Sequence, residues 1–293
     1  MATGFVEIAD RVYAARYPQW DVGVGLVLGS EGALVVDTRA SARQGAEVLQ
    51  DIRRLRAGIR VSHIVNTHVH FDHTFGNGAF VGARILAHEN VARALPGHAA
   101  QIRAALEEDP LGAPEYGYTT QDAADVLGTQ VRPPDATLAT RVTIDLGDRE
   151  VEVAYAGRGH TDGDVALLVP DARAAFLGDL IEESGLPSYG ADSWPLDWAT
   201  TLSAHLDAVP GDAVVVPGHG RPVDADFVRL QARDIDAVAR GIRDRWLTGM
   251  PLEEALADRG GGLPYPVEHL QDAIRRGWAH LDTGWGPATG ESP

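Results

Sequence analysis

The sequence contains no cysteine among its 293 residues. This absence excludes disulfides, thiolate metal ligands and cysteine nucleophiles together. Any metal site must therefore use histidine, carboxylate or backbone oxygen ligands. Basic residues are also scarce, because 25 lysines and arginines face 42 aspartates and glutamates, for a net charge of −17. Such an acidic surface repels nucleic-acid phosphates and anionic lipid, so we expect neither a nucleic acid nor a membrane as partner.

Long apolar runs are missing as well. No stretch approaches the ~18 uninterrupted apolar residues of a transmembrane helix. The N-terminal residues show no basic region followed by an apolar run, so we expect no secretory signal and a cytoplasmic protein. The hydrophobic fraction of 44% is ordinary for a globular protein. Without a convincing linker or repeat, the chain is predicted to be a single domain over residues 1–293.

Apolar runs between turn residues predict strands in two halves, each followed by helices. Residues 22–28 and 33–37 flank a glycine-containing turn and predict a hairpin. Residues 41–57 predict a helix with Ser41 as its N-cap. Further strands are predicted over 61–66, 83–87, 142–146, 151–156, 165–169, 174–177 and 213–216, and helices over 196–209, 224–246, 252–259 and 267–281. The pattern indicates an α/β (α+β) fold, with two layers of sheet inside two layers of helix.

Two long segments contain helical patterns outside this framework. The stretch from residue 88 onward is predicted to be helical in pieces, broken by Pro96, Pro110 and Pro114. Residues 224–281 form a C-terminal helical region with amphipathic spacing.

Potential metal ligands gather directly after the apolar run 61–66. The string His68-Val69-His70-Phe71-Asp72-His73 places four potential ligands within six residues. His68 and His70 point the same way in extended backbone. Asp72 and His73 come after the turn and could face a second ion. This mixture of imidazole and carboxylate suits Zn²⁺.

Three later strand ends repeat the arrangement. His160 lies in a glycine-flanked turn, Asp179 ends an apolar strand, and His219 follows another apolar strand. The glycines beside them let backbone and metal approach closely. Four strand ends with the same kind of side chain indicate one shared metal site.

The string THVHFDH, followed in order by GHT, LGD and PGHG, resembles the metallo-β-lactamase superfamily over residues 22–222. The resemblance implies a four-layer αββα sandwich. It also implies two metal ions, the first held by His68, His70 and His160, the second by Asp72, His73 and His219, with Asp179 bridging them. Asp37, in the string Leu34-Val35-Val36-Asp37, would then orient ligands from beneath.

The chemistry implied is that of a metal-dependent hydrolase. Two Zn²⁺ ions, or Mn²⁺ or Fe²⁺ on the same ligands, would lower the pKa of a bridging water. The resulting hydroxide would cleave an ester, thioester, lactone or related carbonyl compound, with a small molecule as substrate. Asp72 and Asp179 are the expected catalytic carboxylates. Asp72 would orient the nucleophile or accept its proton, and Asp179 would hold the two ions together.

Other activities of the same family stay open. The motifs are most similar to the glyoxalase II and lactonase branches. A β-lactamase is one alternative, and a sulfur dioxygenase with a single iron is another. A non-catalytic scaffold is the least favoured, because burying several carboxylates and imidazoles together is costly without a metal.

Other segments are predicted to form the walls of a substrate pocket around the metals. In this fold residues 88–139 would overhang the metals as a helical lid, with Tyr116 and Tyr118 as substrate contacts. Trp194 and Trp198 would line the opposite wall. The six remaining histidines are interpreted as surface or core residues: His63, His88, His98, His205, His269 and His280.

Overall fold

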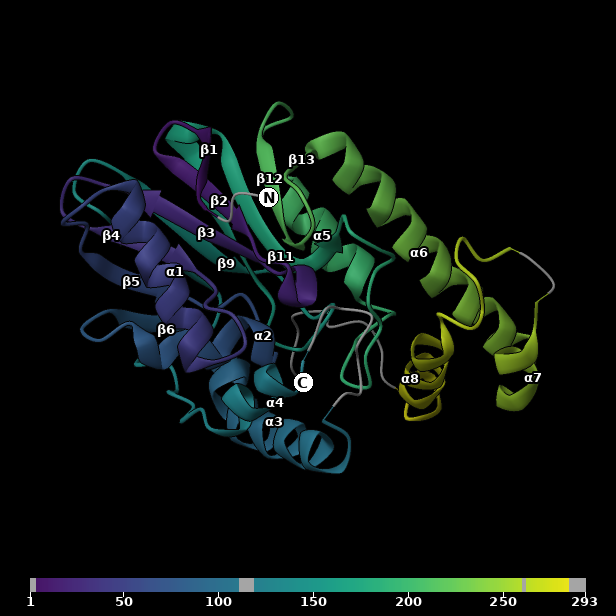
Figure 1. Cartoon of the computed structure of the whole chain (residues 1–293). Helices are drawn as coiled ribbons and strands as arrows, with labels where there is room; N and C mark the ends of the chain where they lie inside the picture. Colours follow the sequence, from purple (N-terminus) through teal and green to yellow (C-terminus); the bar gives the residue numbers. More distant parts are fainter. Residues whose placement is uncertain (1–3, 111–118, 260–261, 285–293) are drawn as a thin grey trace.

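The computed structural model describes residues 4–110, 119–259 and 262–284. Two β-sheets lie face to face in the middle of the molecule (Figure 1). Strands of the first sheet follow the chain order: β1 (Val6–Ala9), β2 (Val12–Arg16), β3 (Gly23–Leu28), β4 (Ala33–Val36), β5 (Val61–Val65), β6 (Arg84–His88) and β7 (Ala136–Leu138). Neighbours are antiparallel from β1 to β4 and parallel from β4 to β7. Parallel neighbours end at the same edge, so the segments after β4 and β5 meet there.

The second sheet repeats this feature with another parallel pair. Its strand order is β13 (Val223–Asp224), β12 (Val214–His219), β11 (Ala174–Glu182), β10 (Val165–Val169), β9 (Glu150–Tyr155) and β8 (Arg141–Asp145). Strands β11 and β12 are parallel, and the other neighbours are antiparallel. The carboxyl ends of β11 and β12 therefore lie together, with Asp179 in β11 and His219 at the end of β12.

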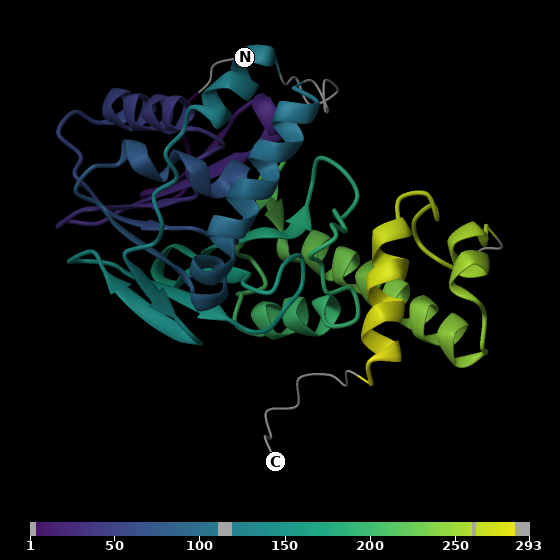
Figure 2. The ribbon, with the colours of Figure 1, turned by 90° about the horizontal axis from the view of Figure 1, so that it is seen from below.

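Helices cover the outer face of each sheet, which completes an αββα sandwich (Figures 1 and 2). Over the first sheet lie α1 (Ala42–Leu55), α2 (Phe71–Thr74), α3 (Glu89–Glu108) and α4 (Thr120–Leu127). Over the second lie α5 (Trp198–Leu206) and α6 (Ala225–Leu247), and α7 (Leu252–Ala257) and α8 (Gln271–Asp282) follow at one end of α6. Short 3-10 turns occur at Gln19–Asp21, Phe75–Ala79 and Pro170–Ala172. Among the described helices, none combines the length and apolar character needed to cross a membrane.

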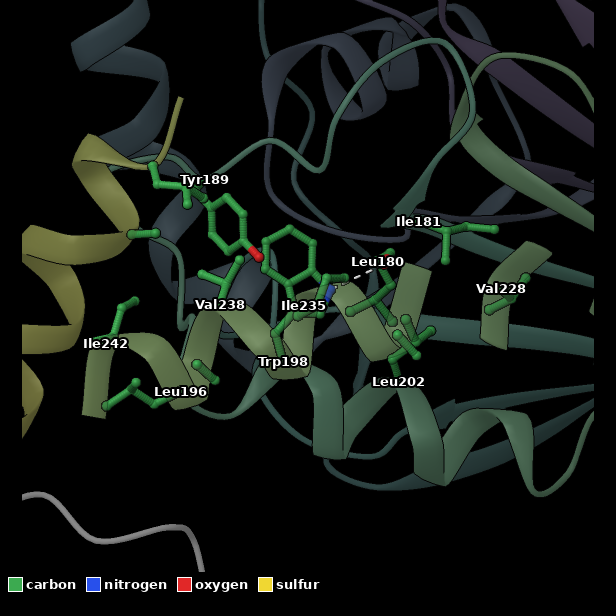
Figure 3. Close-up of a cluster of buried hydrophobic side chains, with 14 of the residues drawn as sticks. Leu180, Ile181, Tyr189, Leu196, Trp198, Leu202, Val228, Ile235, Val238 and Ile242 are labelled. Carbon is green, nitrogen blue, oxygen red and sulfur yellow. Dashed lines mark hydrogen bonds between the residues drawn. The ribbon is translucent and has the colours of Figure 1, made fainter. Parts of the chain in front are cut away.

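Apolar side chains form a separate layer at each interface. Val48 and Ile52 of α1 pack on the outer face of the first sheet. Between the sheets, side chains such as Val36 and Phe176 meet. Figure 3 shows the layer between the second sheet and its helices, where Trp198 lies at the centre and donates its indole N–H to the Leu180 carbonyl at 3.0 Å.

Replacing Trp198 with alanine should destabilise the protein by about 3–5 kcal/mol, because the ring is fully buried and its removal leaves a cavity. Urea unfolding followed by circular dichroism measures this loss. The matched surface change, Leu247→Ala, removes a side chain that is 72% exposed and should cost less than ~0.5 kcal/mol. Equal unfolding midpoints for the two variants would contradict this view of the core.

Most predicted elements are confirmed, with differences at their ends. Ser41 caps α1 by accepting a hydrogen bond from the Gln44 N–H at 3.2 Å. The strand predicted over 174–177 continues to Glu182 as β11. The prediction that Pro96 breaks the helix was wrong, because α3 runs through it from Glu89 to Glu108. Its buried residues Val91, Leu95 and Ala99 lie on both sides of Pro96, so packing outweighs the lost hydrogen bond.

The segment 88–139 starts and ends within the first sheet. His88 belongs to β6 and residues 136–138 form β7, and these two strands are parallel neighbours. Helices α3 and α4 lie between them in sequence. The lid role of this segment stays a prediction, and Tyr116 and Tyr118 lie outside the described residues.

Candidate metal centre

All seven candidate ligands meet at the edge where the parallel strands end. His68 and His70 follow β5, and Asp72 and His73 lie in the single turn of α2. The others come from the second half of the chain, namely His160 before β10, Asp179 in β11 and His219 at the end of β12. The tertiary fold thus places side chains more than a hundred residues apart around one point.

The first group contains His68, His70, His160 and Asp179, whose ligand atoms all lie within 4.8 Å of one another. His70 Nδ1 and His160 Nε2 are 2.9 Å apart. Asp179 Oδ2 lies 3.5 Å from His68 Nε2 and 3.4 Å from His160 Nε2. This arrangement surrounds a small space with three imidazole nitrogens and one carboxylate.

The second group contains Asp72, His73 and His219, again within 4.8 Å of one another. The Nε2 atoms of His73 and His219 are 3.3 Å apart, and each lies 3.5 Å from Asp72 Oδ2. Asp179 also reaches this group, with Oδ1 at 3.3 Å from His73 Nε2 and Oδ2 at 3.2 Å from His219 Nε2. Asp179 therefore lies between the two groups.

Two atoms of this cluster lack hydrogen-bond partners. They are His68 Nε2 and Asp179 Oδ1, and both residues are buried in the protein. A buried polar atom without a partner costs about 1–3 kcal/mol. A cation between the side chains would satisfy both atoms, and imidazole with carboxylate is a donor set that divalent metals such as Zn²⁺ accept. The residues present therefore fit a divalent metal.

Hydrogen bonds on the outer side of two imidazoles fix which nitrogen of each ring faces the centre. His219 Nδ1 lies 2.6 Å from the Trp20 carbonyl, and His160 Nδ1 lies 3.0 Å from the Ser188 carbonyl. A carbonyl only accepts, so both Nδ1 atoms must donate and both Nε2 atoms are left for the centre. Trp20 adopts a left-handed φ of 61°, a strained conformation at the point where its carbonyl holds His219.

His70 faces the centre with Nδ1, whereas His160 and His219 face it with Nε2. Its Nε2 lies 3.0 Å from Asp192 Oδ2, which leaves Nδ1 to face the first group. The ring of His98 stacks on His70 with the centroids 5.2 Å apart. His98 is itself fixed because its Nε2 accepts the Phe71 N–H at 3.1 Å. Asp192 and His98 thus determine how His70 presents its second nitrogen.

Asp37 lies directly beneath the centre and is 2% exposed. Its Oδ2 accepts from His73 Nδ1 at 2.8 Å and from the Thr67 hydroxyl at 2.7 Å. Its Oδ1 accepts the Thr67 N–H at 2.8 Å. The carboxylate therefore ties His73 to the backbone that leads into His68.

Changing Asp37 to asparagine should weaken metal binding by about 10–100-fold, because an amide NH₂ would oppose one of the three donors that the carboxylate accepts. Competition titration with a chelator measures the affinity. As the matched control, Asp212→Asn alters an exposed carboxylate that pairs with Arg173 and should leave metal binding unchanged. Wild-type affinity in the Asp37 variant would show that His73 needs no such partner.

Carboxylates and imidazoles shift one another's protonation in the metal-free centre. Burial lowers the pKa of His219, but Asp179 and Asp72 outweigh it and raise that pKa to about 10. Burial raises the pKa of Asp179, and His219 and His73 bring it well below its ordinary value. The metal-free His219 is therefore protonated at neutral pH. A metal must displace this proton, so affinity increases as pH rises.

The centre opens into a pocket of about 670 Å³. Apart from the candidate ligands, its wall includes side chains from both halves of the chain: Trp20, Phe71, His98, Ile102, Leu186 and His269. His98 and His269, which were interpreted as surface or core residues, both lie on the wall of this pocket. No short motif marks them, because they reach the pocket from α3 and from the segment before α8.

The two tryptophans predicted for the opposite wall do not line this pocket. Trp198 is fully buried, and its ring lies behind His160 with the centroids 5.6 Å apart. Trp194 is stacked between the Arg158 guanidinium, 3.8 Å from its ring centroid, and the His280 ring at 4.4 Å. Asp192, two residues before Trp194, reaches the site instead, and the sequence analysis missed it.

Comparisons with known proteins agree with this geometry. The sequence model of the metallo-beta-lactamase superfamily matches residues 19–219. The acyl-coenzyme A thioesterase MBLAC2 of Bos taurus is 28% identical over 230 residues, which are 75% of this chain and 79% of that protein. A metallo-beta-lactamase type 2 of Bacillus cereus is 25% identical over 203 residues, which are 68% of each protein.

Solved structures share the fold. The sec-alkylsulfatase Pisa1 of Pseudomonas sp. superposes with a TM-score of 0.72 at 16% identity, over 99% of this chain and 52% of that one. This chain thus spans about half the length of the alkylsulfatase. The metallo-beta-lactamase FIM-1 of Pseudomonas aeruginosa gives a TM-score of 0.64 at 16% identity, over 82% of this chain and 97% of that one. At these identities the likeness shows the fold alone.

Proposed function

The chain belongs to the metallo-beta-lactamase superfamily, and from this premise we propose that it is a dinuclear metal-dependent hydrolase, with zinc as its metal. The proposed substrates are small esters, thioesters, lactones or related carbonyl compounds. The observation that carries the proposal is the pair of adjoining donor groups that share Asp179. His68, His70 and His160 would hold one ion, and Asp72, His73 and His219 the other.

Two divalent ions bound there would lower the pKa of a water molecule toward neutrality and polarise the carbonyl that it attacks. The chain itself supplies orientation and exclusion of solvent. Asp179 extends between the two groups and keeps them at a fixed separation. Asp72 lines the pocket and is placed to orient the attacking water or accept its proton. The aromatic wall at Trp20 and Phe71 would shield one side of a bound substrate from bulk water.

The donor set also bears on the alternatives. A single iron held by two histidines and one carboxylate would leave His219 without a role, although its Nδ1 is anchored so that Nε2 faces the centre. In a non-catalytic scaffold, the unsatisfied atoms of His68 and Asp179 would lower the stability of the fold with no function to explain their burial. Both observations favour the dinuclear hydrolase.

The metal content of protein purified without added metal tests the proposal. Mass spectrometry should find about two zinc ions per chain, as a dinuclear site requires. Hydrolysis of a panel of thioesters, lactones, esters and β-lactams should stop on chelation and return with zinc. A single iron ion per chain would favour the dioxygenase alternative over the hydrolase. Failure to bind any metal after reconstitution would overturn the ligand assignment.

A further inference from the structure

Among the described residues that line it, the pocket wall beyond the metal centre contains carboxylates but no arginine. Lysine is absent from the whole sequence, so all 25 basic side chains are arginines. The two acidic residues on the wall outside the candidate ligands are Asp21 and Glu182. Any group bound there meets these two carboxylates and the imidazoles of His98 and His269, but no guanidinium of the described residues.

In the part of the chain that the structure describes, Glu182 is the wall carboxylate that has no guanidinium beside it, although His219 lies within electrostatic reach of it. Asp21 pairs with the Arg16 guanidinium at 2.7 Å. Glu182 ends β11 and is 8% exposed, and its Oε1 accepts the Ser184 hydroxyl at 2.7 Å. In the described part of the chain, no arginine forms an ion pair with it. Its backbone is held on both sides by the Gln231 amide, at 2.8 Å each, so the side chain starts from a fixed position.

The rest of the wall is apolar. Trp20 and Phe71 meet edge to face with their centroids 5.2 Å apart, and Ile102 and Leu186 lie on the same pocket. Bringing a like charge close to a partly desolvated carboxylate costs several kcal/mol. We propose, resting on the hydrolase function above, that the pocket selects uncharged or cationic apolar acyl groups and rejects anionic ones. Glu182 is the residue that sets this preference.

Three matched six-carbon esters test the substrate class: p-nitrophenyl hexanoate, the p-nitrophenyl monoester of adipate, and p-nitrophenyl 6-(trimethylammonio)hexanoate. They are compared as kcat/KM of the zinc-loaded protein, each divided by its uncatalysed rate. The assay is run at pH 8.5, far above the ordinary pKa of a glutamate, so that the wall carboxylates are ionised. We expect the adipate ester to react at least ~10-fold less efficiently than the other two.

The variant Glu182→Gln keeps the side-chain size and should narrow the ratio of hexanoate to adipate by at least ~3-fold. Glu183→Gln is the matched control, because Glu183 pairs with Arg221 at 2.8 Å and is not on the pocket wall, so it should leave the ratio unchanged. Equal efficiency for all three esters, or a ratio that Glu182→Gln does not narrow, would overturn the charge selection. If the zinc-loaded protein cleaves none of the esters, lactones or thioesters, the hydrolase function fails instead.

A second inference comes from the loop 183–197, which connects β11 to α5. Two of its residues orient candidate ligands of the first group. The Ser188 carbonyl accepts from His160 Nδ1, and Asp192 accepts from His70 Nε2, each at 3.0 Å. The conformation of this loop therefore determines how both imidazoles face the centre.

Side chains beyond residue 219, where the family match ends, hold this loop. His269 Nε2 donates to the Pro187 carbonyl at 2.8 Å, and Arg276 Nε in α8 donates to the Ser193 carbonyl at 2.9 Å. Pro187 immediately precedes Ser188. Ser193 immediately follows Asp192. Each C-terminal donor thus fixes the residue next to one that orients an imidazole.

We infer that His269 and Arg276 are positioning residues for the first donor group. They touch neither group directly and act through the loop. Their removal should therefore weaken metal binding at His68, His70 and His160. Binding at Asp72, His73 and His219 should stay the same, because these side chains are held by Asp37 and Trp20 instead.

Stepwise zinc binding measured by chelator competition tests this selectivity. The binding step that His160→Ala removes identifies the first group. Arg276→Ala and His269→Ala should weaken that step by about 10-fold or more and leave the other unchanged. Arg276→Lys, which can still donate one hydrogen bond, should restore part of the affinity.

Arg275→Ala is the matched control, since Arg275 lies exposed on the same helix and should not change either step. Urea unfolding of the metal-free variants separates positioning from a general loss of stability. Equal weakening of both steps, or no weakening of either, would overturn the inference.

Discussion

Asp179→Ala is expected to abolish hydrolysis and to leave less than one tightly bound metal ion per chain. The Asp179 carboxylate lies within 3.5 Å of donors in both groups, with Oδ1 toward His73 and Oδ2 toward His160 and His219. Without it, the imidazoles of four histidines lose the carboxylate that they share, namely His68, His73, His160 and His219. Activity should fall at least ~10³-fold, because a metal pair provides several kcal/mol of transition-state stabilisation.

Metal content by mass spectrometry and kcat/KM on the best substrate of the panel provide the two measurements. Asp212→Ala, which removes an exposed carboxylate, is the matched control and should keep both at wild-type values. Circular dichroism establishes that each variant folds. A folded Asp179→Ala protein with full activity would refute the central role given to this carboxylate.

Gly218→Ala is expected to have an effect of similar size, although glycine carries no functional group. A Cβ built on Gly218 would lie 1.8 Å from Asp179 Oδ1, and 3.0 Å from both the Asp179 Cγ and the Gly178 carbonyl carbon. No side chain fits there unless the carboxylate moves. We expect metal affinity to fall at least ~100-fold, the upper end of what displaced ligand contacts cost.

Chelator competition measures this affinity, and a thermal melt of the metal-free protein reports the fold. Gly211→Ala is the matched control, because the nearest atom to its added Cβ is Arg229 Nη2 at 3.9 Å. The metal-free melting temperatures of the two variants should be similar. Unchanged metal binding by a folded Gly218→Ala protein would mean that Asp179 can act from another position.

The candidate site was predictable to the extent that its residues follow strand ends. His68, His70, Asp179 and His219 each come directly after an apolar run, and the structure brings them together. Asp37 was expected beneath the site from the family resemblance, and it hydrogen-bonds His73. A strand end is a local feature marked by the short apolar run before it, so the sequence alone reveals it.

Other features depend on contacts between distant segments. Asp192 and His269 lie outside any strand-end pattern, yet one orients His70 and the other holds the loop that orients His160. Trp198 was expected on the pocket wall because it follows Asp179 in sequence, but burial against α6 draws its ring into the core. Pro96 was expected to end a helix, and packing on both of its sides kept α3 continuous.

By itself the sequence determined the imidazole and carboxylate donors, the positions of the strands along the chain, and the absence of thiols and lysine amines. Residue identity and local apolar patterns are properties of the chain alone. The tertiary structure alone decided which imidazole nitrogen faces the centre, which loop residues hold it there, and which charges line the pocket. These depend on distances between segments far apart in sequence. The direction of a hydrogen bond and the set of charges around a pocket are defined only once such segments are packed together.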